Sequence, residues 1–121
     1  MDAGGRSISL ERFAEIVGRD DFMLDVAALQ IGAWEYPERD IEAYRAKIDA
    51  LADQAAYDVG RASNSIGRAR AISDWLFDRL GYYGNTEDYY DPRNSFLSDV
   101  IDRRTGIPIT LSVLYLEVAR R

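Results

Sequence analysis

The sequence predicts an all-α protein of about six helices, folded as one domain over its 121 residues. Apolar residues recur every three or four positions along most of the chain, which is the spacing of a helix with one buried face. Glycine, proline and capping residues separate these periodic stretches. No stretch alternates apolar and polar residues as a half-buried strand does.

The first two helices follow a start, residues 1–8, that we expect to be flexible. Ser9 suits the N-cap of the first helix, and Gly18 suits its end. Asp20 or Asp21 suits the N-cap of the second, whose apolar side is Phe22, Val26, Leu29 and Ala33. The helical N-terminal region then extends over residues 9–81.

The third helix is predicted to begin near Asp40, shortly after Pro37 has ended the second. Its apolar face is formed by Ile41, Tyr44, Ile48, Leu51 and Ala55. We expect its charged residues to form a solvated face: Glu42, Arg45, Lys47, Asp49 and Asp53. A small, polar segment over residues 60–67 is predicted to be a loop.

A fourth helix follows that loop and ends at Gly81. Its apolar residues are Ala69, Ile72, Leu76 and Leu80, with Trp75 and Phe77 beside them. Residues 82–95 then form a long, tyrosine-rich connection without predicted secondary structure. Loops of this length are uncommon in compact domains and are often functional or packed on themselves.

Residues 96–121 are predicted to form the last two helices, the first capped by Asn94 or Ser95. Pro108 suits the first turn of the second, and Gly106 suits a left-handed end of the helix before it. Two apolar stripes run along this final helix: Ile107, Leu111, Leu114 and Val118, beside Ile109, Val113, Leu116 and Ala119. Such a helix is buried from more than one direction. Arg121 follows without a capping residue, so we expect a helix that is cut off or nearly so, and able to self-associate.

Composition excludes several kinds of chemistry. The chain has no cysteine, which removes disulfides and thiol catalysis, and no histidine, which removes the usual general base and the commonest metal ligand. We therefore expect neither a metal nor a cofactor. The net charge of −6 disfavours nucleic acid and anionic membranes. With no apolar run long enough for a membrane span and no signal-peptide core, we expect a cytoplasmic protein.

Three segments also carry a family resemblance. DPRNSFLSDVIDRRTGIPITLSVLYLEVARR, over residues 91–121, resembles the signature of transglutaminase-like proteins of the bacterial invasin-synthesis-regulator (SirB) type. Upstream, LFDRLGYYGN and EYPERDIEAYRAKIDALA resemble the helical N-terminal part of the same family. Related domains occur in some F-box proteins. The resemblance implies the helical half of a papain-like superfamily domain, without its β-sheet.

The resemblance does not imply the reaction of that superfamily. Its nucleophilic cysteine lies at the N-terminus of the central helix, where this chain has Pro108, and its histidine and aspartate follow that helix. Thr110 and Ser112 lack a histidine to activate them. We expect both hydroxyls to bond within the helix or to pack in the interior. No catalytic residue is therefore predicted.

The remaining candidates are residues that could contact a partner or ligand: Tyr89, Tyr90, Asp91, Arg93, Asn94, Arg103 and Arg104. Tyrosine is frequent at binding hot spots, and guanidinium groups pair with carboxylates in two-pronged fashion. The same residues also suit packing, turn formation and internal ion pairs.

Three functions stay open. The first is a non-catalytic module that binds a protein partner, as scaffold or regulator. The second is the N-terminal part of a longer enzyme whose base lies beyond Arg121. The third is a ligand or peptide sensor that uses Arg103 and Arg104.

Overall fold

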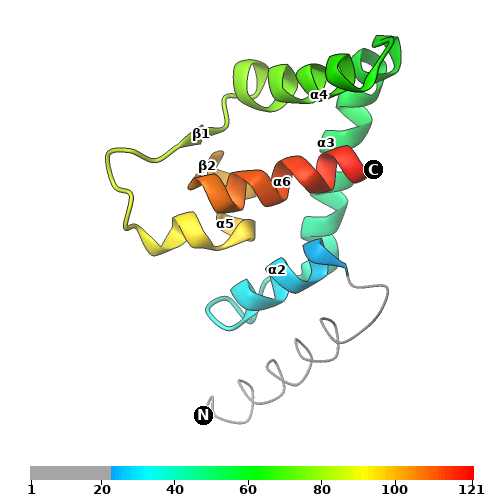
Figure 1. Cartoon of the computed structure of the whole chain (residues 1–121). Coiled ribbons are helices and arrows are strands. Elements are labelled where there is room, and N and C mark those ends of the chain that lie inside the picture. The colour runs from blue at the N-terminus through cyan, green and yellow to red at the C-terminus, as the bar shows by residue number, and fades with distance from the viewer. Residues whose placement is uncertain (1–22) are drawn as a thin grey trace.

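The computed structural model describes residues 23–121, which form five α-helices and two very short strands (Figure 1). The prediction of an all-α fold is confirmed. The helix predicted to begin at Ser9 and the caps predicted at Asp20 and Asp21 lie outside the described residues. Within these residues, no helix is both long enough and apolar enough to cross a membrane.

Helix α2 covers Leu24–Ala33 and α3 covers Ile41–Arg61. Helix α3 begins next to Asp40 as predicted, and the carboxylate of Asp40 caps it by accepting the N–H of Glu42 at 3.0 Å. Tyr44, Ile48 and Ala55 are buried along one face of α3, also as predicted.

Helix α4 covers Ser65–Ser73, so the loop before it is shorter than expected: it spans only residues 62–64. Asn64 caps α4 by accepting the N–H of Gly67 at 2.7 Å. The chain continues directly into a π-helical turn, η1, over Asp74–Arg79. Gly81 follows at a φ of 76°, a conformation that glycine adopts without strain, and the helical region ends there as predicted.

The predicted tyrosine-rich loop contains structure that its sequence did not reveal. Strand β1, Tyr83–Gly84, pairs in parallel with β2, Thr105–Gly106. A 3₁₀ turn, η2, covers Pro92–Ser95. A two-residue strand is too short to show any alternation in sequence, which is why neither strand was predicted.

Helix α5 covers Leu97–Arg103 and α6 covers Pro108–Arg120. Two local predictions here are wrong. The N-cap of α5 is Phe96, with no side-chain hydrogen bond, instead of Asn94 or Ser95. The left-handed residue that ends α5 is Arg104, at a φ of 56°, instead of Gly106.

Helix α6 packs against α2, α3, α4 and α5, which surround it on several sides (Figure 1). Its Leu114 and Val118 join the core together with residues from every described α-helix: Leu29, Tyr44, Ile48, Ile72, Leu76, Leu97 and Ile101. Tyr115 ties α6 to α4 by donating its hydroxyl to the carbonyl of Ala69 at 2.8 Å. Thr110 and Glu117 of α6 are also buried, Leu111, Val113 and Tyr115 are partly buried, and the remaining side of the helix is exposed.

Candidate functional site: the N-terminus and exposed crest of helix α6

The N-terminus of α6 is built by a buried threonine. The Thr110 hydroxyl donates to the carbonyl of Asn94 at 2.7 Å and accepts the N–H of Ile107 at 3.1 Å. Thr110 is 8% exposed. Its hydroxyl is therefore committed to joining α6 to η2, as the sequence suggested, and is not free to act as a nucleophile.

Gly106 lies against this threonine, and its role is close packing instead of a left-handed turn. A Cβ added at Gly106 would lie 2.8 Å from the Thr110 hydroxyl and 3.1 Å from both methyl groups of Val100. Only glycine lets β2, α5 and α6 approach one another so closely. Pro108, the next residue but one, begins α6 and is exposed.

Asn94, a predicted contact residue, is fully buried in the structure. Its side-chain amide donates to the carbonyls of Asp88 and Tyr89 at 2.9 and 3.0 Å, and so holds the tyrosine-rich loop against η2. Tyr89 and Tyr90 are 52% and 90% exposed and meet edge to face with ring centroids 5.3 Å apart. The loop thus presents two tyrosine rings to solvent.

The predicted arginines lie in ion pairs or capping contacts. Arg93 makes a two-pronged pair with Asp91, with a shortest distance of 2.6 Å, and this pairing lowers the pKa of Asp91 to about 2. Arg103 lies 3.7 Å from the same carboxylate. Arg104 donates to the carbonyl of Leu80 at 2.9 Å. Whether these residues also contact a partner stays a prediction.

The exposed side of α6 carries apolar residues where a surface helix carries polar ones. Ile109 and Leu116 are 72% and 55% exposed, and Ser112 and Ala119 between and beyond them are also exposed. We call these four residues the crest of α6. The exposure of Ser112 contradicts the prediction that it packs in the interior.

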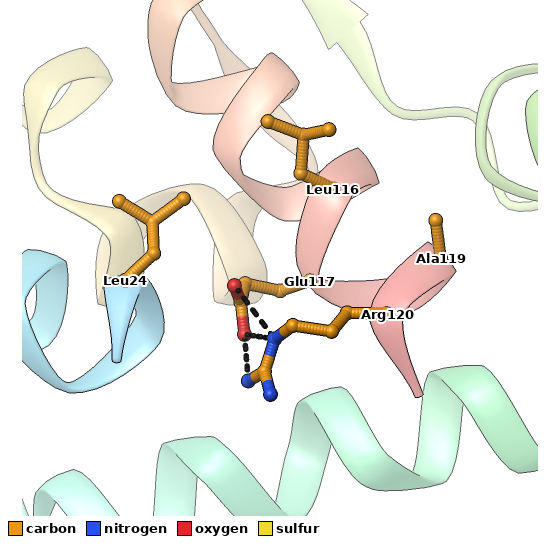
Figure 2. Close-up of a pocket in the computed structure, with 5 residues that line it drawn as sticks. All are labelled: Leu24, Leu116, Glu117, Ala119 and Arg120. Carbon is orange, nitrogen blue, oxygen red and sulfur yellow. Dashed lines mark hydrogen bonds and ion pairs between the residues drawn. The ribbon is translucent and has the colours of Figure 1, made fainter. Parts of the chain in front are cut away.

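A groove runs between the crest and helix α2. One part, about 250 Å³ in volume, has almost wholly apolar walls that include Ile31 and Ala28 of α2 and Ile109 and Val113 of α6. The other part, about 490 Å³, lies between Leu24 and Leu116, with the Glu117–Arg120 ion pair beside them (Figure 2). Leu24 lines both parts. The groove and the crest form one apolar face.

Below this face lies a buried charge cluster that the sequence did not predict. Asp25 of α2 and Glu117 of α6 are 0% and 2% exposed. Arg121 reaches both of them, at 2.7 and 2.9 Å, and Arg45 of α3 donates to Asp25 at 3.0 Å. Burial by itself raises the pKa of Asp25, but the hydrogen bonds from Arg121 and Arg45 lower it by more. The net pKa is below the ordinary value, so the carboxylate stays charged.

Asp25 and Glu117 lie on largely apolar helices, where nothing in the local pattern separates a buried carboxylate from an exposed one. Arg45, in turn, belongs to the face of α3 that was predicted to be solvated. That prediction is confirmed for Lys47 and Asp49, which are exposed although they pair with Asp102 and Arg121. It is wrong in part for Arg45, which is half-buried and pairs with the buried Asp25. Long-range pairing of this kind leaves no signal in sequence spacing.

Comparison with known proteins settles the family. The family model described as transglutaminase-like superfamily matches residues 42–121, which include α3 to α6. The chain belongs to the transglutaminase-like superfamily. Its similarity to a UPF0162 protein of Xylella fastidiosa is 42% identity over 94 residues, covering 78% of this chain and 34% of that protein. No solved structure gives a significant match.

Two further relatives extend the comparison. A UPF0162 protein of Vibrio cholerae is 28% identical over 102 residues, and F-box only protein 21 of the mouse is 51% identical over 51 residues, or 8% of its length. The chain spans about a third of the length of the UPF0162 relatives. The resemblance to an F-box protein domain seen in the sequence is therefore matched by a named protein.

Within this superfamily, the N-terminus of α6 is the position that the resemblance assigns to the nucleophile. There the chain has Pro108, with the bonded hydroxyl of Thr110 one turn into the helix. Among residues 23–121, no three acidic side chains gather in a way that could hold a metal ion.

Proposed function

We propose that this chain is a non-catalytic transglutaminase-like module that binds a protein partner through the apolar face formed by α2 and the crest of α6. The observation that carries the proposal is the exposure of Ile109 and Leu116 on a helix whose opposite side forms the core. Contiguous exposed apolar surface commonly marks an interaction site.

The absence of reactive groups supports the non-catalytic part of the proposal. Covalent catalysis of the transglutaminase type needs a nucleophile and a base, and this sequence has neither cysteine nor histidine. Thr110 is the hydroxyl nearest the start of α6, and both of its bonds are used to fix the fold. We also keep the SirB-type assignment, the cytoplasmic location and the absence of nucleic-acid binding as parts of this proposal.

An activity assay tests the catalytic question directly. The purified chain is incubated with a glutamine-containing peptide and a primary amine, and hydrolysis and amine incorporation are followed by mass spectrometry. We expect neither product above the level of a buffer control. Turnover that scales with chain concentration and is abolished by one substitution that leaves the fold intact would overturn the proposal.

The alternative is that this chain is the N-terminal helical part of a longer enzyme. The observation in its favour is that the chain spans only about a third of the UPF0162 relatives. In that case the apolar face of α2 and α6 is covered by a further part of the same protein. Adding the corresponding downstream segment of a relative, and repeating the amide assay, separates the two functions.

A further inference from the structure

Three arginines gather where helix α3 meets helix α4. Arg61 is the last residue of α3, and Arg68 and Arg70 lie on α4. A Cβ added at Gly67 would lie 3.2 Å from the Cβ of Ala62, so the first turn of α4 lies against the end of α3. Figure 1 shows this corner at the end of α3 that is farther from α2. We call the three arginines the arginine corner.

The arginine corner differs from the other cations of the chain. Within residues 23–121, none of its three arginines forms an ion pair, and all three are exposed. The other arginines and the lysine of this part of the chain pair with carboxylates, except Arg104, which donates to the carbonyl of Leu80. The guanidinium groups of the corner are therefore open to an anion from another molecule.

The corner is also a positive region of an acidic chain. Residues 59–73 contain these three arginines and no aspartate or glutamate, whereas the whole chain carries a net charge of −6. The rest of the chain therefore carries −9. Arg68 lies one turn into α4, where the helix dipole favours acidic residues, and the first turn of α4 has none. This arrangement does not stabilise α4, which favours a role in binding.

Two large exposed side chains flank the corner. Tyr57 is 72% exposed, and the centre of its ring lies 5.6 Å from the guanidinium carbon of Arg61. Ile66 is 68% exposed and lies one turn before Arg70, on the same side of α4. Tyrosine and arginine are frequent among the residues that dominate binding energies. A ligand at the corner can thus gain apolar contacts as well as charge pairs.

We propose that the arginine corner binds an acidic segment of a partner protein, one in which aspartate or glutamate is interspersed with apolar residues. The carboxylates pair with the guanidinium groups, which bind them in two-pronged fashion. The apolar residues of the segment cover Ile66 and Tyr57. The corner shares no residue with the apolar face of α2 and α6, so binding at one surface does not require the other.

A short acidic segment fits the charge distribution better than an extended polyanion. A DNA duplex or an anionic bilayer extends well beyond the corner and meets the negative charge of the rest of the chain. The nine residues of α4 span about 14 Å. A peptide of about 12 residues is long enough to cross this distance even when it is helical.

Selection from a phage-displayed library of random peptides of about 12 residues identifies the segment. The library is first depleted on the variant R61Q/R68Q/R70Q, which removes peptides that bind elsewhere, and is then selected on the unaltered full chain. We expect the surviving peptides to be rich in aspartate and glutamate, with leucine, isoleucine or aromatic residues between them. Synthetic copies should bind with a dissociation constant on the order of 1–100 µM by fluorescence anisotropy.

Substitutions separate the charge pairs from the apolar contacts. R61Q/R68Q/R70Q should weaken binding of these peptides at least about 10-fold and remove most of its dependence on salt. Ile66→Ser should weaken binding about 3- to 10-fold and leave the salt dependence unchanged, because it removes apolar contact alone. The matched control A43E/A46E/A50E lowers the net charge equally, at exposed positions in the first half of α3, and should leave the affinity within about threefold.

The proposal is overturned if no acidic peptide survives the selection, or if the acidic peptides bind R61Q/R68Q/R70Q as tightly as they bind the unaltered chain. It is also overturned if a DNA duplex or a vesicle containing phosphatidylserine binds at the corner more tightly than the peptides do at the same salt concentration. None of these results touches the non-catalytic role, which fails only if the amide assay shows turnover.

Discussion

Replacing Asp25 by asparagine should destabilise the fold more than a comparable change at most other positions. The Asp25 carboxylate is fully buried and accepts hydrogen bonds from Arg121 at 2.7 Å, from Arg45 at 3.0 Å and from the N–H of Val26 at 2.8 Å. Asparagine keeps the shape, but its side-chain NH₂ group faces a guanidinium donor and the charge is lost. The change therefore breaks one buried, charge-assisted contact and weakens another.

The size of this loss of stability depends on which carboxylate partners the two arginines retain. Breaking a buried ion pair commonly costs about 3–5 kcal/mol when it leaves an uncompensated charge. Here Arg45 retains Glu42, and Arg121 retains Asp49 and Glu117. We therefore expect a loss of about 2–3 kcal/mol in the free energy of unfolding, which corresponds to a fall in Tm of roughly 10–20 °C for a domain of this size.

Thermal and urea unfolding, followed by circular dichroism at 222 nm, measure this loss. Asp53→Asn is the matched control, because Asp53 is exposed on α3 and has no ion pair within the described structure. If the Asp25 and Asp53 variants melt at the same temperature, the buried cluster does not stabilise the fold and the reasoning fails.

The same cluster predicts an acid dependence. The pKa of Asp25 is lower in the folded chain than its ordinary value of 3.8, because the bonds from Arg121 and Arg45 outweigh the effect of burial. A lowered folded pKa contributes stability that is present above about pH 4 and is lost as pH falls through the folded value. Asp25→Asn should therefore flatten the decline in stability below pH 4, as measured by urea unfolding at several pH values. An unchanged decline would contradict this.

Three further predictions concern local structure. Gly106→Ala, whose Cβ would lie 2.8 Å from the Thr110 hydroxyl, should cost about 1–3 kcal/mol in urea unfolding. Asn94→Ala removes the side-chain donor to the loop carbonyls of Asp88 and Tyr89, so it should speed proteolysis within residues 85–91 and cost about 1–2 kcal/mol. Burial, together with the hydrogen bond to the Asp102 carboxylate at 2.6 Å, raises the pKa of Tyr44 to about 12. The contribution of Tyr44 to the free energy of unfolding should therefore be complete below pH 10 and fall as pH rises to 12. Tyr44→Phe should remove that fall.

Each of these three changes has a control. Gly84→Ala places a Cβ in open space and should be close to neutral. Gln54→Ala changes an exposed amide on α3, and Tyr57→Phe changes a tyrosine that is 72% exposed. If a control matches its test variant in unfolding, or in loop proteolysis for Asn94, the local contact argued above does not carry the effect.

Local sequence determined much of this fold because helical periodicity, caps and helix ends each depend on residues that are close together in the chain. The period of apolar residues placed α3 and α6, Asp40 fixed the start of α3, and Gly81 fixed the end of the region before the tyrosine-rich loop. Pro108 and the missing cysteine and histidine bear on chemistry directly, since they are properties of composition and position. The signature in residues 91–121 identified the superfamily, which the family model then confirmed.

Tertiary structure decided which polar groups are buried and which apolar ones are exposed. Asp25 and Glu117 share the core side of their helices with aliphatic residues, and only the arrival of Arg45 and Arg121 from elsewhere makes their burial tolerable. Ile109 and Leu116, in contrast, lie on a stripe that the sequence predicts to be buried. Hydrophobic period fixes the faces of a helix, but only the packing of its neighbours decides which face is covered.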